Sequence, residues 1–145
     1  MADPTWAPTL AQVAAYVPKR TRPTGDTSDD PLGTFTTATR PTATQVGQLI
    51  SDACTWVLSR TGVPAGNATA VAAATVAAAL RAAGMVELGY PGEDPDTNAA
   101  EVLLEQADAQ LALLVEAADT DPNPAGPLLP VWAFPAPVAW GDKLL

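Results

Sequence analysis

Residues 67–90 read NATAVAAATVAAALRAAGMVELGY, and this stretch decides the fold. Alanine dominates it, and alanine loses the least on entering a helix. Asn67 is a favoured N-cap residue, and the helix breakers within GYPG, residues 89–92, end the segment. Apolar side chains continue round most of its circumference, with Arg81 as the one charge before Glu87. We therefore predict a central helix that other helices cover closely on several sides.

Two alternatives apply to the same stretch. It is long enough to span a membrane, but its apolar character comes from alanine and threonine, and Arg81 lies well inside it. We therefore favour a buried helix over a membrane span. The other alternative is a flexible alanine-rich tract. Larger apolar residues argue against it because they supply burial, namely Val71, Val76, Leu80, Met85, Val86, Leu88 and Tyr90.

The composition narrows the class of protein. A length of 145 residues suggests one domain, and the many alanines with few aromatic residues indicate a helical one. Such a core is thin, so oligomerisation is a reasonable source of further burial. The net charge of −9 disfavours a general nucleic-acid binder, which carries a basic face. The N-terminus shows no basic region followed by an apolar run, so we expect no signal peptide.

No catalytic or cofactor signature is visible. The chain has no histidine, which removes the commonest general base and metal ligand, and it has no P-loop or G-x-G-x-x-G motif. The acidic runs at 26–30 and 93–96 lack the spacing of a calcium-binding loop. Cys54 cannot form an internal disulfide, and its place on an apolar stripe favours a buried small residue over a reactive thiol. We expect no enzymatic activity, cofactor or metal.

Three further helices are predicted, each beginning at a capping-box pattern. They cover about 9–17, 42–60 and 98–119, with Thr9, Thr42 and Asn98 as N-caps. Their apolar stripes are Leu10, Val13, Ala14 and Val17; then Val46, Leu49, Ile50, Ala53, Cys54, Val57 and Leu58; then Leu104, Ala107, Leu111, Leu114, Val115 and Ala118. Trp6 is expected to anchor the lead-in, and Trp56 to fill a joint with another helix or subunit.

Residues 18–41 show no helical period and are rich in proline, glycine and threonine, which predicts a long loop. Within it, GTFTTATR at 33–40 favours a short strand or a β-hairpin arm. The basic cluster is Lys19, Arg20 and Arg22. It fits contact with DNA or an acidic neighbour, and it fits a solvated turn, which we favour.

The last predicted helix carries an acidic face of Glu101, Glu105, Asp108 and Glu116, and no Lys or Arg occurs between Arg81 and Lys143. A one-signed surface is usually a solvated face, and one this uncompensated often has a purpose.

Composition changes at Asp121, where recurrent prolines exclude a helix or a central strand. Residues 121–145 nevertheless carry many large apolar side chains. A proline-stiffened segment loses little entropy on docking, so we read it as an arm that docks on a partner, rather than one that folds back over its own helices. The predicted docking residues are Leu128, Leu129, Val131, Trp132, Phe134, Val138 and Trp140. The prediction is therefore an all-α bundle of about four helices (1–120) with an extended arm (121–145).

Three segments resemble the head–tail connector (adaptor) proteins of tailed bacteriophages of the siphophage type. They are WAPTLAQVAAYVPKRT at 6–21, GTFTTATRPTATQV at 33–46, and MVELGYP at 85–91. The resemblance covers roughly residues 6–119 in order, and the chain length and the four-helix layout agree with it.

The resemblance implies a structural protein of the virion neck, made in the host cytoplasm. It implies a ring, usually of twelve subunits, that binds beneath the portal, extends the DNA channel and meets the stopper. On this basis we expect the arm to reach the portal. Loop residues Lys19, Arg20, Arg22, Phe35 and Arg40 are expected to meet the tail-side partner. Acidic residues Glu93, Asp94, Glu101, Glu105 and Asp108 are expected to face the channel, where negative walls repel passing DNA. The alternative is a small helical protein-interaction subunit that forms no ring.

Overall fold

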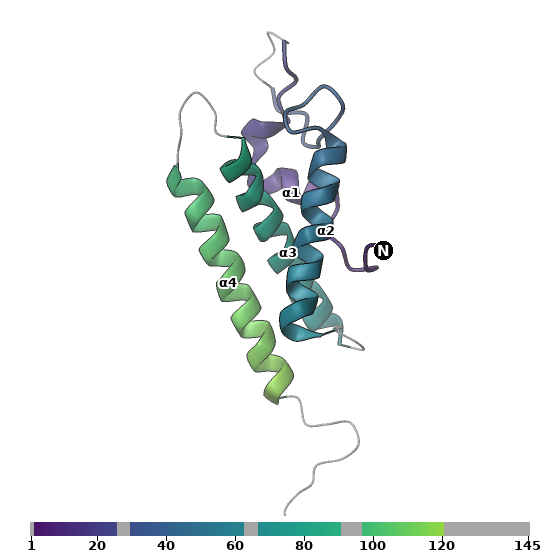
Figure 1. Cartoon of the computed structure of the whole chain (residues 1–145), viewed down its shortest axis with the longest axis vertical. Helices are drawn as coiled ribbons and strands as arrows, with labels where there is room; N and C mark the ends of the chain where they lie inside the picture. The colour runs from purple at the N-terminus through teal and green to yellow at the C-terminus, as the bar shows by residue number, and fades with distance from the viewer. Residues whose placement is uncertain (1, 26–29, 63–66, 91–96, 121–145) are drawn as a thin grey trace, which may run out of the picture.

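Four α-helices and one short 3₁₀ helix make up the part of the chain that the computed structural model describes, which is residues 2–25, 30–62, 67–90 and 97–120 (Figure 1). The elements are α1 (Leu10–Tyr16), the 3₁₀ helix η1 (Pro18–Thr21), α2 (Ala43–Thr61), α3 (Ala68–Gly89) and α4 (Thr97–Thr120). No strand occurs in these ranges. The predicted all-α bundle is confirmed.

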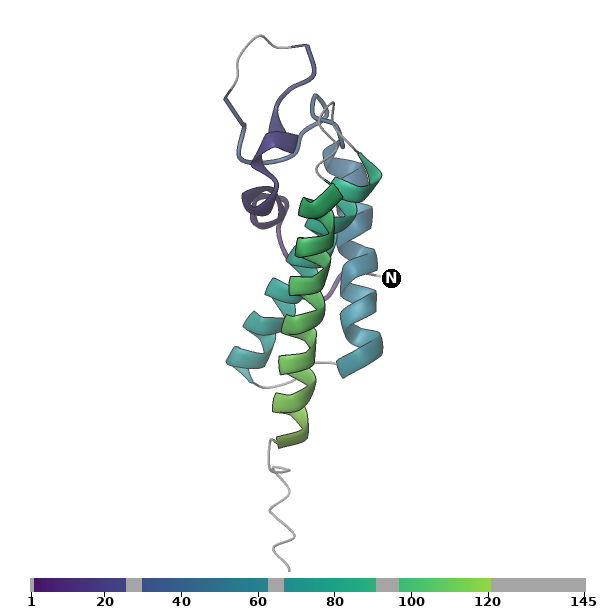
Figure 2. The same cartoon turned by 90° about the vertical axis from the view of Figure 1, so that its left-hand side faces the viewer.

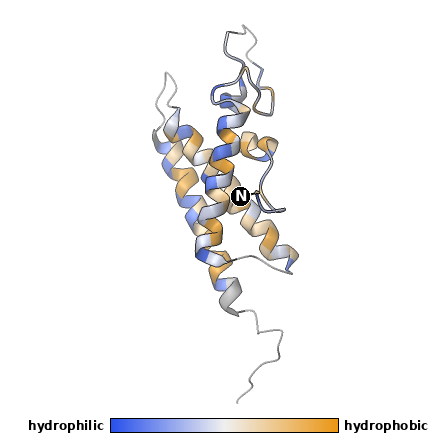
Figure 3. Ribbon diagram, turned by 45° about the vertical axis from the view of Figure 1, so that its right-hand side comes forward, coloured by the Kyte–Doolittle hydropathy of each residue, from blue (hydrophilic) through white to orange (hydrophobic). Residues whose placement is uncertain are grey.

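The long helices α2, α3 and α4 lie side by side and alternate in direction (Figures 1 and 2). Helix α3 contacts α1, α2 and α4, whereas α1 and α4 do not contact each other. In Figure 3 apolar and polar residues alternate along the helices, which is the pattern of amphipathic helices around a shared core. The central position predicted for the alanine-rich helix is confirmed.

The helix starts follow from side-chain caps. The Thr9 hydroxyl accepts from the amide of Gln12, and the Gln12 side chain accepts from the amide of Thr9. Thr42 and Gln45 make the same reciprocal pair at the start of α2. At α3, the Asn67 side chain accepts from the amides of the first turn. Each cap satisfies backbone donors that the helix itself leaves free, so all three predicted starts are confirmed.

Two helix ends also have local causes. Helix α2 ends at Thr61, and Gly62 follows with a φ of +69°, a conformation that glycine adopts without the steric cost of a side chain. Helix α4 begins at Thr97. Asn98 therefore lies inside the first turn, and the prediction that Asn98 caps this helix is wrong, because a cap residue precedes the first residue of the helix.

Small side chains bring α3 close to its neighbours. Its buried positions include seven of the smallest residues, namely Ala74, Ala77, Ala78, Ala79, Ala82, Ala83 and Gly84. A Cβ atom placed on Gly84 would lie 2.8 Å from Cγ and Cδ2 of Leu104 on α4. The two helices therefore meet at a distance that glycine permits and alanine does not.

The core agrees closely with the predicted stripes. Val13, Val46, Val57 and Val86 are fully buried, and so is Ala107 of α4. The outer part of the α4 stripe is less covered than predicted, since Leu104 and Val115 are half-buried.

The N-terminal lead-in is fastened to the bundle as expected. Trp6 is buried in the core cluster. Its carbonyl accepts a 2.8 Å hydrogen bond from the Thr75 hydroxyl of α3. Ser51 of α2 donates a 2.6 Å bond to the Asp3 carboxylate. The lead-in is thus tied to two helices.

Helix α3 alone among the described helices is long and apolar enough to cross a membrane, as judged by length and composition. Half of its most apolar window is buried inside the bundle. That burial supports the interpretation of α3 as a core helix.

The long loop predicted for residues 18–41 is present in the described segments, with two corrections. Its first residues form η1, because Pro18 has the φ angle that suits the first position of a helix. The hairpin predicted at 33–40 is wrong, since a single antiparallel bridge between Pro23 and Thr39 replaces it. Threonine hydroxyls bind the local backbone there, which competes with a strand ladder.

Candidate functional site

One residue of the basic cluster after α1, Arg20, forms an ion pair inside the molecule. Arg20 of η1 reaches Glu87 near the end of α3 in a bidentate arrangement, with Nε 3.0 Å from Oε1 and Nη2 2.5 Å from Oε2. Both side chains are mostly covered, at 19% and 14% exposed. Arg20 therefore fastens the loop to α3, which is a structural role that the sequence did not reveal.

Two buried threonines hold the loop in one shape. The Thr21 hydroxyl donates to the carbonyl of Pro18 at 2.8 Å and accepts from the amide of Gly33 at 3.3 Å. The Thr39 hydroxyl accepts from the amide of Thr36 at 3.0 Å and donates to the carbonyl of Pro41 at 2.8 Å. Because these polar groups are buried and satisfied, the described parts of the loop form a defined surface.

The predicted loop residues therefore separate into two groups. Lys19, Arg22 and Arg40 are exposed at the loop end of the molecule. Phe35 is only 3% exposed and belongs to the hydrophobic core. Phe35 and Arg20 stabilise the fold, and the three other basic residues form the exposed surface at this end.

The acidic face of α4 lies on the outside of the bundle. Glu101, Glu105, Asp108 and Glu116 are all exposed, while Leu111 and Leu114 on the opposite side are buried. At about 3.6 residues per turn, the four carboxylates follow one side of the helix. The other predicted acidic residues, Glu93 and Asp94, lie outside the described residues.

Cys54 has the environment of a core residue. It is 1% exposed on the inner side of α2. Burial, together with the nearby negative charge of Asp3, raises the pKa of the Cys54 thiol from 9.0 to about 11. The thiol is therefore neutral at physiological pH, which confirms the predicted buried role and leaves no nucleophilic thiolate.

Within the described ranges, no group of three or more histidine, cysteine, aspartate or glutamate side chains is placed to hold a metal ion. The expectation that the chain has no enzymatic activity stays a prediction.

Trp56 of α2 lies against α3. The sequence predicted that it fills a joint with another helix or with another subunit, and the structure shows the first of these. The guanidinium carbon of Arg81 lies 4.9 Å from the centre of the Trp56 ring, so the one charge in the middle of α3 is accommodated by an aromatic face of α2.

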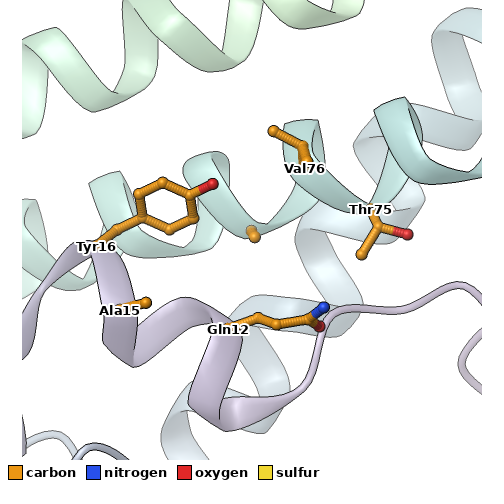
Figure 4. Close-up of a pocket in the computed structure, with 6 residues that line it drawn as sticks. Gln12, Ala15, Tyr16, Thr75 and Val76 are labelled. Atoms are coloured by element: carbon orange, nitrogen blue, oxygen red, sulfur yellow. The ribbon is translucent and has the colours of Figure 1, made fainter.

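A shallow apolar groove runs between α1 and α3 (Figure 4). Its volume is about 180 Å³, and its walls are Gln12, Ala15 and Tyr16 of α1 with Thr75, Val76 and Ala79 of α3. Tyr16 is 41% exposed and Val76 is 37% exposed. Sequence reasoning missed this groove because its two walls lie some sixty residues apart in the chain.

An exposed apolar stripe runs along α4 beside the acidic face. Val102 is 47% exposed and Leu113 is 58% exposed, with exposed Gln106 and Ala109 between them. These four positions recur at spacings of four, three and four residues, the spacing of a helix face that packs on another helix. That spacing was visible in the sequence and was overlooked, because the buried stripe of the same helix is longer.

The predicted docking arm, from Leu128 to Trp140, lies outside the described residues. Comparison with known proteins adds no family: no family model, no curated protein and no solved structure matches this chain. The functional argument therefore rests on the residues and on the geometry described above.

Proposed function

We propose that this chain is a head–tail connector (adaptor) subunit of a tailed bacteriophage. In this proposal it is a structural virion protein that forms a ring beneath the portal, extends the DNA channel and joins the capsid to the stopper. The ring contains about a dozen subunits, as the resemblance to connector proteins implies. The alternative remains a helical interaction subunit that forms no ring.

One observation carries the proposal. The three segments by which the chain resembles connector proteins, the third of them distant in sequence from the first two, form one structural unit. The Arg20–Glu87 ion pair joins the first segment to the third. The hydrogen bond from the Gly33 amide to the Thr21 hydroxyl joins the first to the second. These contacts support the proposal because they place the three segments against one another in the fold.

The charge of α4 supports a channel role. Glu101, Glu105 and Asp108 lie on an exposed face, and the sequence supplies no lysine or arginine between Arg81 and Lys143 to neutralise them. A negative wall repels the phosphate backbone, so DNA slides past it without binding. In the proposed ring Glu101 and Asp108 of this face line the channel, and Glu105 lies at its border.

The remaining surfaces are then assigned to the two neighbours. The loop end, with exposed Arg22 and Arg40, meets the stopper or another tail-side protein. The arm at 121–145, through Trp132, Phe134 and Trp140, docks on the portal. Aromatic side chains on a proline-stiffened segment are suited to such a contact.

The test is the mass of the purified chain in solution, alone and mixed with the portal of the same genome, followed by electron microscopy of the mixture. A ring stacked on the portal is expected. A chain ending at Thr120 should keep its helix content and lose portal binding. A full-length chain that ignores its own portal refutes the adaptor function and favours the interaction subunit. A truncated chain that binds the portal as well as the full-length chain refutes the arm assignment alone.

A further inference from the structure

We propose that neighbouring copies of this chain meet through two surfaces that the resemblance does not assign. In this contact the apolar stripe of α4 in one copy, formed by Val102, Ala109 and Leu113, packs into the α1–α3 groove of the next copy. The inference rests on the self-assembly that the proposed function requires, and it names the residues that form the contact.

The positions of the two surfaces make the contact heterologous. The groove is built by α1 and α3, the stripe lies on the outer side of α4, and α1 and α4 do not contact each other. One copy thus carries a projecting surface and a receiving surface at different places. A pair joined in this way keeps one free groove on one copy and one free stripe on the other, so further copies can add, and the series closes into a ring when the rotation between neighbours divides the circle.

The sizes and the chemistry of the two surfaces agree. A cavity of about 150 Å³ with apolar walls holds a benzene-sized group, and the groove offers about 180 Å³ between walls that include Tyr16 and Val76. A leucine side chain fits this space. Leu113 is the most exposed large apolar side chain described on α4, at 58%.

Charge complementarity identifies a second copy as the occupant. Glu105 borders the apolar stripe on α4, because it lies about 40° from Ala109 round the helix. Lys19 is exposed three residues after Tyr16, the groove residue that ends α1. When the stripe enters the groove, an acidic border meets a basic one. Glu101 and Asp108 lie farther round the helix and stay available to the channel.

The experiment uses three variants of the full chain, each with an added glutamate. Leu113→Glu alters the stripe, and Val76→Glu alters the groove. Ala112→Glu is the matched control, since it adds the same charge to the next position of α4, which points into the acidic face. All three sites are exposed, so circular dichroism should show unchanged helix content. Val102→Glu is a second stripe variant in case Leu113→Glu loses helix content.

Light scattering over a range of concentrations measures the association. The wild-type chain and Ala112→Glu should associate alike. Leu113→Glu and Val76→Glu should each shift the association to concentrations roughly a hundredfold higher or more, because each places a charge in an apolar contact. Mixing these two variants should give dimers and nothing larger, since the intact stripe of one fits the intact groove of the other.

Three results overturn the contact: a wild-type chain that stays monomeric both alone and with its portal, a Leu113→Glu chain that associates as the wild type does, or a mixture that stays monomeric. Its failure is distinct from failure of the proposed function. If Leu113→Glu still forms a ring on the portal, the contact is wrong and the adaptor function stands. If the wild type associates through this contact but does not bind its portal, the contact is right and the adaptor function is wrong.

Discussion

Replacement of Gly84 by alanine tests the close approach of α3 and α4. The new methyl group would lie 2.8 Å from two atoms of the Leu104 side chain and 3.4 Å from the carbonyl oxygen of Ala100. Overpacking of this kind costs about 1–3 kcal/mol. Alanine in place of glycine within a helix returns about 0.5–1 kcal/mol. We expect Gly84→Ala to lower the free energy of unfolding by about 1 kcal/mol.

The matched control is Gly47 of α2, where a Cβ atom would have no neighbour within 4 Å. Gly47→Ala receives the gain in helix propensity without the clash, so it should raise the free energy of unfolding by about 0.5–1 kcal/mol. Urea unfolding followed by circular dichroism measures both variants. The change in the free energy of unfolding should therefore be negative at Gly84, where packing dominates, and positive at Gly47, where helix propensity dominates.

The Leu104 side chain provides the internal check. In the Gly84→Ala variant, Leu104→Ala removes the atoms that clash with the new methyl group. Leu104→Ala should therefore lower the free energy of unfolding by about 1 kcal/mol less in this variant than in the wild-type chain. A Gly84→Ala variant that is as stable as Gly47→Ala, with no coupling to Leu104, would refute the close packing of the two helices.

Three further predictions follow from single contacts. A thiol reagent at pH 8 should modify native Cys54 at least about a hundredfold more slowly than the urea-unfolded chain, and stability should fall as pH rises from 9 toward 11, since the unfolded thiol loses its proton first. Thr42→Ala should lower the free energy of unfolding by about 1 kcal/mol while Thr42→Ser leaves it nearly unchanged, and an equal loss in both would rule out the cap. A double-mutant cycle on Arg20 and Glu87 should give a coupling of about 1 kcal/mol that weakens in salt, and a coupling of zero would mean that the pair does not hold the loop.

The helices were predictable because their signals are local. A capping box needs two residues three positions apart, so Thr9 and Thr42 marked their helices directly. Asn98 imitated such a signal one residue inside the true start, because asparagine is also tolerated in a first turn. Local patterns thus give the existence of a helix more reliably than its first residue.

The loop and the groove were not predictable in the same way. The threonines around Phe35 have the propensity of a strand, but their hydroxyls bind backbone groups nearby, and Phe35 enters the core. The role of Arg20 depends on Glu87, sixty-seven residues away. The groove depends on α1 lying against the middle of α3. These features come from tertiary contacts that no short pattern contains.

The order of the helices has a consequence for how the chain folds. Each long helix packs against the one that follows it, α2 on α3 and α3 most extensively on α4. Contacts between consecutive helices are short in sequence separation, which favours rapid folding. Longer-range contacts include those between α1 and α3 and between α2 and α4, and the bonds that tie Trp6 and Arg20 back to α3. During synthesis these N-terminal segments emerge before α3. The contacts of α1 with α3, and the groove between them, therefore form only after α3 has left the ribosome.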